Sequence, residues 1–172
     1  MMDSSIGTTR ISEVMTSLVL TANATDQMEN LARVFEEQDI NAAPVVDESG
    51  KCVGIITSHD LVEFEAARQL MQNEISHGYY YNLAHYGDGA SEAIPGLNFN
   101  EVGFHMTKTL ETVGHDEPLS SAARKMCQKH IHHLIVLDQD QKPAGILSTL
   151  DILGHLLGEP ITRDNKSNQA ND

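Results

Sequence analysis

The sequence predicts an α+β protein built from two copies of one β-α-β-β-α unit. A heptapeptide of the form Gly-apolar-apolar-Ser/Thr-x-x-Asp occurs twice, as GIITSHD at 54–60 and GILSTLD at 145–151. When the chain is aligned with itself at the offset of these heptapeptides, 91 residues, twelve identities fall between residues 14 and 62 without a gap. A match of this length indicates an internal duplication, so both copies should share one fold.

Each copy begins with a short strand and an amphipathic helix. The strands are expected at LVLT (18–21) and TLET (109–112), and the helices should start within 23–26 and at Asp116, with Pro118 in the first turn. Apolar residues recur in each helix at i, i+3 and i+7, which predicts one buried face. These residues are Met28, Leu31 and Phe35 in the first copy and Leu119, Ala122 and Met126 in the second.

Each copy continues with a hairpin and a closing helix. The apolar runs APVVD and LIVLD are followed by polar turns and then by CVGIIT and PAGILS, a pattern typical of two buried strands. A unit of this size buries too little surface to be stable alone. We therefore expect the copies to pack as one module around a pseudo-twofold axis, with two related clefts between them.

The remaining segments lie outside the repeat. We expect a polar N-terminal segment at 1–10, the first copy at 11–66, an insertion at 67–101, the second copy at 102–158 and a polar tail at 159–172. The insertion contains all four tyrosines. It could cover the sheet or extend the core, form a lid over a ligand, or contact a second subunit.

Composition excludes several classes of function. The chain has 11 Lys and Arg against 25 Asp and Glu, a net charge of −14, and no basic cluster that would neutralise nucleic-acid phosphates. No apolar run approaches the ~20 residues of a membrane span, and the first ten residues are too polar for a secretory signal. Cys52 and Cys127 have neither disulfide-framework nor metal-site spacing. We expect a cytoplasmic protein with reduced thiols.

The heptapeptides have two chemical interpretations. Thr57 with Asp60, and Ser148 with Asp151, fit the capping box at a helix start. The same atoms could bind a ligand instead, because the helix N-terminus attracts phosphate and the carboxylate can accept hydrogen bonds from a ribose. The leading glycine would then let a flat ligand approach the backbone.

The full set of motifs identifies a family. VMT, PVVD and GIITSHD in the first copy, with HMT, LIVLD and GILSTLD in the second, resemble the cystathionine-β-synthase (CBS) domain, two of which in tandem form a Bateman module. The resemblance implies binding of AMP, ADP, ATP or S-adenosylmethionine in the clefts between the repeats. Asp60 would hold the ribose and Thr57 would lie near the phosphates of one site. Asp151 and Ser148 would do so in the other.

The resemblance also implies contacts from the opposite repeat. They would come from Thr16 or Thr107 before the first strand, and from a segment before the second strand. That segment contains Ile40, Asn41 and Ala42 in the first copy and Ile131, His132 and His133 in the second. The two sites are therefore chemically unequal, and one ligand per chain is as consistent with the sequence as two.

The histidines of the second repeat have three interpretations. They could be structural, contact a phosphate, or bind a metal, although no acidic or cysteine ligand falls beside them at a familiar spacing. If His132 or His133 contacts a phosphate, binding should strengthen as the pH falls and an imidazole takes up a proton.

The sequence favours a regulatory sensor over a catalyst. It contains no Ser/His/Asp order, activated cysteine, metal motif or phosphate-transfer loop, so we expect no enzyme activity. The adenosyl ligand would act as an effector of a protein target that the sequence does not name. Homodimerisation through the helices is implied by the resemblance. The alternative is a dimerising or scaffold module whose ligand sites have degenerated.

Overall fold

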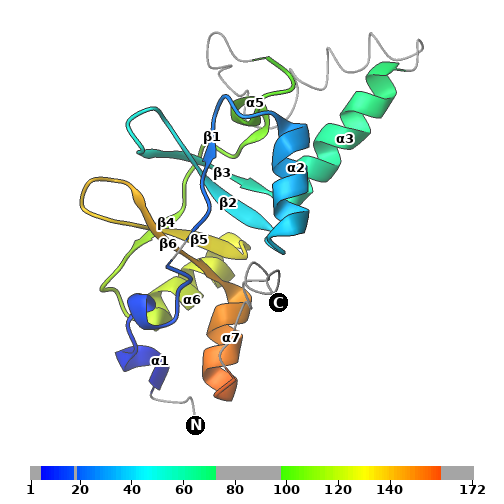
Figure 1. Cartoon of the computed structure of the whole chain (residues 1–172). Helices are drawn as coiled ribbons and strands as arrows, with labels where there is room; N and C mark the ends of the chain where they lie inside the picture. The colour runs from blue at the N-terminus through cyan, green and yellow to red at the C-terminus, as the bar shows by residue number, and fades with distance from the viewer. Residues whose placement is uncertain (1–4, 18, 73–97, 160–172) are drawn as a thin grey trace, which may run out of the picture.

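The computed structural model of the chain describes residues 5–17, 19–72 and 98–159. These residues form two three-stranded sheets, each with its own helices, and the two sheets lie beside one another in the middle of the molecule (Figure 1). The predicted α+β fold with two related units is confirmed.

The first repeat has the expected order of elements. Its strands are β1 (Ala22–Asn23), β2 (Ala42–Val46) and β3 (Cys52–Thr57), with β1 parallel and β3 antiparallel to the central β2. Helices α2 (Met28–Glu37) and α3 (Ser58–Gln72) follow β1 and β3. The predicted hairpin of two strands is therefore confirmed, and the second of these strands ends at the heptapeptide threonine.

The second repeat has the same topology and the same irregularity. It contains β4 (Thr112–Gly114), α6 (Leu119–Lys129), β5 (His133–Leu137), β6 (Pro143–Ser148) and α7 (Thr149–Leu157), with β5 central. The register of each hairpin shifts at equivalent positions, between Val45 and Val46 in the first repeat and between Val136 and Leu137 in the second. A bulge kept in both copies is a property of the unit rather than a local accident.

The first strand and first helix of each repeat begin later than predicted. LVLT and TLET lie largely before β1 and β4, and the helices begin at Met28 and Leu119. The difference arises because an acidic side chain holds a turn between strand and helix. The Asp26 carboxylate accepts from the backbone N–H of Asn23 at 2.7 Å, and the Glu117 carboxylate accepts from that of Gly114 at 2.7 Å. Side-chain bonds of this kind compete with helix formation.

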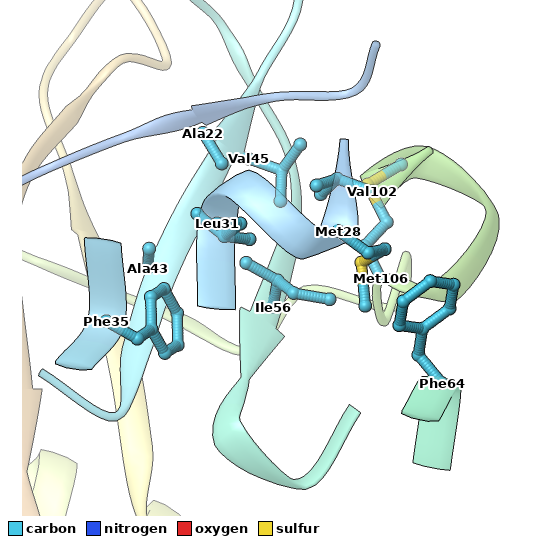
Figure 2. Close-up of a cluster of buried hydrophobic side chains, with 10 residues drawn as sticks. All are labelled: Ala22, Met28, Leu31, Phe35, Ala43, Val45, Ile56, Phe64, Val102 and Met106. Carbon is cyan, nitrogen blue, oxygen red and sulfur yellow. The ribbon is translucent and has the colours of Figure 1, made fainter. Parts of the chain in front are cut away.

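The core consists of two clusters, one for each sheet. The predicted apolar stripes of α2 and α6 are buried in them, as the sequence indicated. Figure 2 shows the cluster of the first repeat, in which α2, β2 and β3 contribute side chains around Ile56. The same view shows Val102 and Met106 in this cluster, although both residues belong to the start of the second repeat in sequence.

The segment leading into each repeat packs on the other repeat. Ile11, in the 3-10 turn η1 (Ile11–Glu13), is fully buried in the cluster of the second repeat. Val102, in α5 (Val102–His105), occupies the equivalent position and is fully buried in the cluster of the first. Thr16 pairs with Ile146 through two backbone hydrogen bonds of 3.0 Å. The repeats therefore complete each other's cores.

The end of the insertion joins the core of the first repeat. The Phe99 ring lies 5.5 Å from that of Phe64 and 5.6 Å from that of Phe104, between centroids, and the His105 Nε2 atom lies 2.6 Å from the Phe99 carbonyl oxygen. Burial lowers the pKa of His105, against the opposing effects of the Phe99 carbonyl and of Asp60. This end extends the core, whereas the tyrosines lie outside the described residues.

No helix in the described ranges combines the length and the apolar character needed to cross a bilayer.

Candidate functional site

The second heptapeptide forms a closed capping box at the start of α7. The Asp151 carboxylate accepts from the backbone N–H of Ser148 at 2.7 Å and from its hydroxyl at 2.6 Å. The backbone N–H of Asp151 donates back to the Ser148 hydroxyl at 3.1 Å. Ser148 and Asp151 are only 4% and 7% exposed. Their polar atoms therefore satisfy one another, as the capping interpretation predicted.

The first heptapeptide is more open. The Asp60 carboxylate accepts from the backbone N–H of Thr57 at 2.6 Å and from its hydroxyl at 2.7 Å. Both residues are only partly buried, in contrast to their counterparts in the second repeat. The Thr57 hydroxyl donates to Asp60, so its lone pairs remain available to a donor on a ligand.

The heptapeptide glycines make room for protein. A Cβ atom at Gly54 would clash with the Met106 sulfur, and one at Gly145 would lie 2.5 Å from the Met15 sulfur. The expected approach of a flat ligand at these positions is wrong, because the segment leading into the opposite repeat fills the space. Because of this close contact, the segment leading into each repeat can pair with the third strand of the other repeat's sheet.

A cavity of about 480 Å³ lies between the two repeats, beside the first heptapeptide. This volume is within the range of small-molecule sites. Its walls come from the start of α3, the segment before β2, the segment between α5 and β4, and the α6–β5 connection. The lining residues are Asn41, Ile55, Thr57, Ser58, His59, Thr107, Thr109, Leu110, Glu111, His130, Ile131, His132, His133 and Ile135.

The cavity brings together part of the predicted site. Residues of both repeats meet there as expected, and the predicted residues that line it are Asn41, Thr57, Thr107, Ile131, His132 and His133. Asp60 is not among the lining residues but is hydrogen-bonded to Thr57.

The other predicted residues lie away from the wall. Ile40 packs against the first core cluster, and Ala42 is buried at the start of β2. The remaining predicted residues that do not line the cavity are Thr16, Ser148 and Asp151.

Sequence reasoning missed one wall of the cavity. Thr109, Leu110 and Glu111 were expected within a strand, whereas they precede β4 and face the cavity. The only available signal was their position directly after Thr107, which the family resemblance had placed at the site.

Glu111 is the charged residue of this wall, and two lysines hold it. Its carboxylate lies 3.0 Å from the Lys125 Nζ atom and 3.0 Å from the Lys129 Nζ atom. These two ammonium groups, Lys129 first, lower the pKa of Glu111. Lys125 also donates to the Thr112 carbonyl at 2.7 Å. Among the described residues, neither a lysine nor an arginine lines the cavity itself.

The histidines are arranged along the α6–β5 connection. His130 ends α6 in the left-handed conformation with φ of 54°, and its equivalent in the first repeat, Asp39, has φ of 52°. The carbonyl of His132 accepts from the backbone N–H of Thr149 at 3.0 Å. In the described part of the chain, no group of three or more His, Cys, Asp or Glu side chains is close enough to hold a metal ion.

Comparison with known proteins identifies the fold. The family model of the CBS domain matches residues 11–67 and 100–158. The chain belongs to the CBS domain family. It is a tandem CBS pair, and both matches span the segments that cross between the repeats.

Curated relatives of this CBS pair are longer proteins. The chain is 28% identical over 144 residues to a homoserine O-acetyltransferase of Methanohalobium evestigatum, covering 84% of this chain and 23% of that protein. It is also 28% identical over 144 residues to an L-aspartate semialdehyde sulfurtransferase of Methanocaldococcus jannaschii, covering 84% and 22%. The chain thus spans less than a quarter of each of these relatives.

Solved structures include CBS pairs with bound ligands. The CBS domain pair of protein MJ0100, in complex with 5′-methylthioadenosine and S-adenosyl-L-methionine, has a TM-score of 0.66 and 25% identity, covering 87% of this chain and 97% of that one. CBSX2 in complex with AMP has a TM-score of 0.64 and 21% identity, covering 87% and 96%. The second likeness supports the fold alone.

Proposed function

We propose that this CBS pair is a regulatory module that binds an adenosyl ligand in the cavity beside Thr57. The proposal depends chiefly on one observation, namely that Thr57 of the first repeat and Thr107 of the second line the same cavity. An occupant would contact both repeats, so binding could change how they pack and alter affinity for a protein target. The adenosyl ligands of the MJ0100 CBS pair support this class of ligand.

The cavity offers suitable chemistry for such a ligand. Ile55, Leu110, Ile131 and Ile135 provide apolar surface for a purine ring. The Thr57 hydroxyl provides a polar anchor at the edge of this surface. We propose that Asp60, which holds Thr57, also accepts hydrogen bonds from the ribose hydroxyls. Its role in the site would then combine positioning with binding.

We further propose that each chain binds one ligand. Ser148 and Asp151 of the second heptapeptide are buried, and their polar groups are satisfied within the capping box. Exposing them to a ligand would break those hydrogen bonds, whereas Thr57 of the first heptapeptide already lines a cavity. The duplication thus left two equivalent heptapeptides with different roles.

Ligand binding should raise the thermal stability of the protein. At a concentration of 100 times its dissociation constant, a ligand stabilises the native state by about 2.7 kcal/mol, which raises the melting temperature by several degrees. A thermal-shift panel of AMP, ADP, ATP, S-adenosylmethionine, 5′-methylthioadenosine and NAD measures this. If none of these shifts the melting temperature, the proposal fails and the scaffold alternative is favoured.

Two matched substitutions locate the binding site. Thr57→Val should lower the affinity for the ligand that stabilises the protein at least about tenfold. The substitution removes a hydroxyl at the cavity wall while keeping the side-chain shape. Ser148→Ala, at the equivalent position, should lower the free energy of unfolding by about 1 kcal/mol and leave ligand affinity unchanged. Calorimetric titration and urea denaturation separate the two effects. If Ser148→Ala abolished binding and Thr57→Val did not, the ligand would bind at the second heptapeptide instead.

We propose that two chains pair through α7. This helix exposes Leu150, Leu153 and Leu157 at i, i+3 and i+7, with exposed fractions of 56%, 50% and 66%. A stripe of this kind is suited to pack against another helix. Sedimentation at micromolar concentrations should show a dimer that Leu153→Glu converts to a monomer. Leu20→Glu, at an exposed leucine outside α7, is the control. A monomeric wild-type protein would refute the pairing.

We also propose that the module works in the cytoplasm and regulates rather than catalyses. Cys52 and Cys127 are unpaired, which suits a reducing compartment. Burial raises the pKa of the Cys52 thiol, so it is a poor nucleophile at neutral pH.

A further inference from the structure

We propose that His105 makes the second leading segment (98–107) sensitive to acid, so that a fall in pH loosens the attachment of this segment to the first repeat. His105 is the last residue of α5, and Thr107 of the same segment lines the cavity. Acid would therefore act on a wall of the candidate site through a residue outside that wall. The inference requires no ligand in the cavity, so it stands apart from the proposed function.

His105 lies in a cluster of aromatic rings that joins the second leading segment to α3. Its ring centroid is 4.9 Å from that of Phe99 and 5.1 Å from that of Phe104, both in the same segment. It is also 5.1 Å from the ring centroid of Phe64, a residue of α3 that is 3% exposed and belongs to the first core cluster. An ionisable side chain thus sits in the apolar contact between the segment and the core.

The hydrogen bond of His105 indicates which ring nitrogen carries its proton. The Phe99 carbonyl oxygen can only accept, so the Nε2 atom, 2.6 Å from it, is the protonated nitrogen of the neutral ring. A second proton would go to Nδ1, which has no hydrogen-bond partner in the described part of the chain. The neutral imidazole is therefore the form that suits this contact.

Burial holds the pKa of His105 below its usual value, against the opposing effects of the Phe99 carbonyl and of two carboxylates in α3. The carboxylates are those of Asp60 and Glu63, and Glu63 also pairs with His59 at 3.2 Å. Among the described residues, these are the charged groups that act on the His105 ring. Their attraction for an imidazolium does not outweigh the loss of hydration.

The direction of the pH effect follows from this lowered pKa. As the pH falls below about 6.5, the unfolded chain protonates this histidine before the folded chain does, so the folded state loses stability. The loss falls on the contact between the second leading segment and the first repeat. Val14 occupies the equivalent position in the segment that leads into the first repeat, and it cannot titrate. The two segments should therefore respond differently to acid.

Amide hydrogen exchange of the full chain tests this difference at two matched positions. The backbone N–H of Thr107 donates to the Ile55 carbonyl at 2.9 Å, and that of Thr16 donates to the Ile146 carbonyl at 3.0 Å. Between pH 7.5 and pH 5.5, the protection factor of Thr107 should fall at least about threefold more than that of Thr16. His105→Gln keeps a hydrogen-bond donor but cannot take up a proton, so it should abolish this difference.

A control variant and a second measurement make the result specific. His115→Gln removes an exposed histidine of the second repeat and should leave the wild-type difference unchanged. NMR titration of the wild-type ring signals should show His105 titrating below its ordinary value of about 6.5, which tests the idea if His105→Gln does not fold.

Three results would overturn the inference. They are equal changes at Thr107 and Thr16, a difference that persists in His105→Gln, and a His105 ring that titrates at or above its ordinary value. Each of them leaves the proposed function intact, because no ligand is present in these experiments.

Discussion

Replacing Ile11 by alanine is expected to lower the free energy of unfolding by about 2–5 kcal/mol, the usual cost of truncating a fully buried isoleucine. Ile11 is 0% exposed and packs with Leu119, Leu134 and Leu147 in the core cluster of the second repeat. It is the first residue of the first repeat, so a local view of the chain would not assign it to the core of the second. The loss of stability on substitution therefore measures how much the segment leading into the first repeat contributes to the core of the second.

Urea denaturation followed by circular dichroism measures this change. Val102→Ala, at the equivalent position in the other leading segment, should also destabilise, by a smaller amount because fewer buried atoms are lost. Leu20→Ala, at a residue that is 37% exposed, should change stability by less than about 0.5 kcal/mol. A loss below about 1 kcal/mol for Ile11→Ala would mean that the leading segment does not contribute to the core of the second repeat.

Adding a methyl group at either heptapeptide glycine should destabilise the fold by about 1–3 kcal/mol through overpacking. A Cβ atom at Gly145 would lie 2.5 Å from the Met15 sulfur and 3.0 Å from the Thr16 carbonyl oxygen. A Cβ atom at Gly54 would clash with the Met106 sulfur and lie 3.1 Å from the Thr107 carbonyl oxygen. The methionine could move, but the backbone carbonyl is held by its pairing with the third strand.

Thermal and urea denaturation of Gly145→Ala and Gly54→Ala measure the effect. Gly7→Ala is the control, because a Cβ atom there meets nothing within 4 Å and the residue lies in α1 (Ser5–Thr8). Combining Gly145→Ala with Met15→Ala should cost less than the sum of the two changes, since the second removes the nearest clashing atom. Additive losses, or an unperturbed Gly145→Ala variant, would show that the segments are not in close contact.

The two substitutions address the same structural feature from opposite sides. Ile11 tests what the leading segment contributes to the neighbouring core, and Gly145 tests how closely that segment approaches the neighbouring sheet. Because the cavity lies beside Thr107, which the second crossing segment holds against Ile55, the same feature positions the candidate site. Variants that loosen this packing should therefore also lower the affinity for the proposed adenosyl ligand.

Much of the fold could be predicted from the sequence. The hairpin strands 52–57 and 143–148, the buried stripes of α2 and α6 and the closing helices all follow from short-range patterns, which are repeated in both copies. The first strands and the helix starts were less predictable. Their boundaries depend on Asp26 and Glu117, whose side chains can either begin a helix or hold a turn.

The candidate site could be predicted only in part. Of the residues that the family resemblance identified, those that line the cavity are Asn41, Thr57, Thr107, Ile131, His132 and His133. Asp60, Thr16, Ile40 and Ala42 do not line it. The resemblance gave equal weight to Ser148 and Asp151, whose environment is closed. Equivalent residues in a duplicated sequence carry the same local signal, so their difference in burial cannot be read from the heptapeptides.

By itself the sequence determined that one unit is duplicated, how each unit is ordered, and where the caps and hairpins lie, since these depend on residues close together in the chain. Only the tertiary structure decided that the segment leading into each repeat packs on the other repeat. It also decided that methionine side chains pack against Gly54 and Gly145, and that Glu111 and Thr57 line the same cavity. These features arise from contacts between segments dozens of residues apart, whose geometry is fixed by packing of the two units rather than by any local pattern.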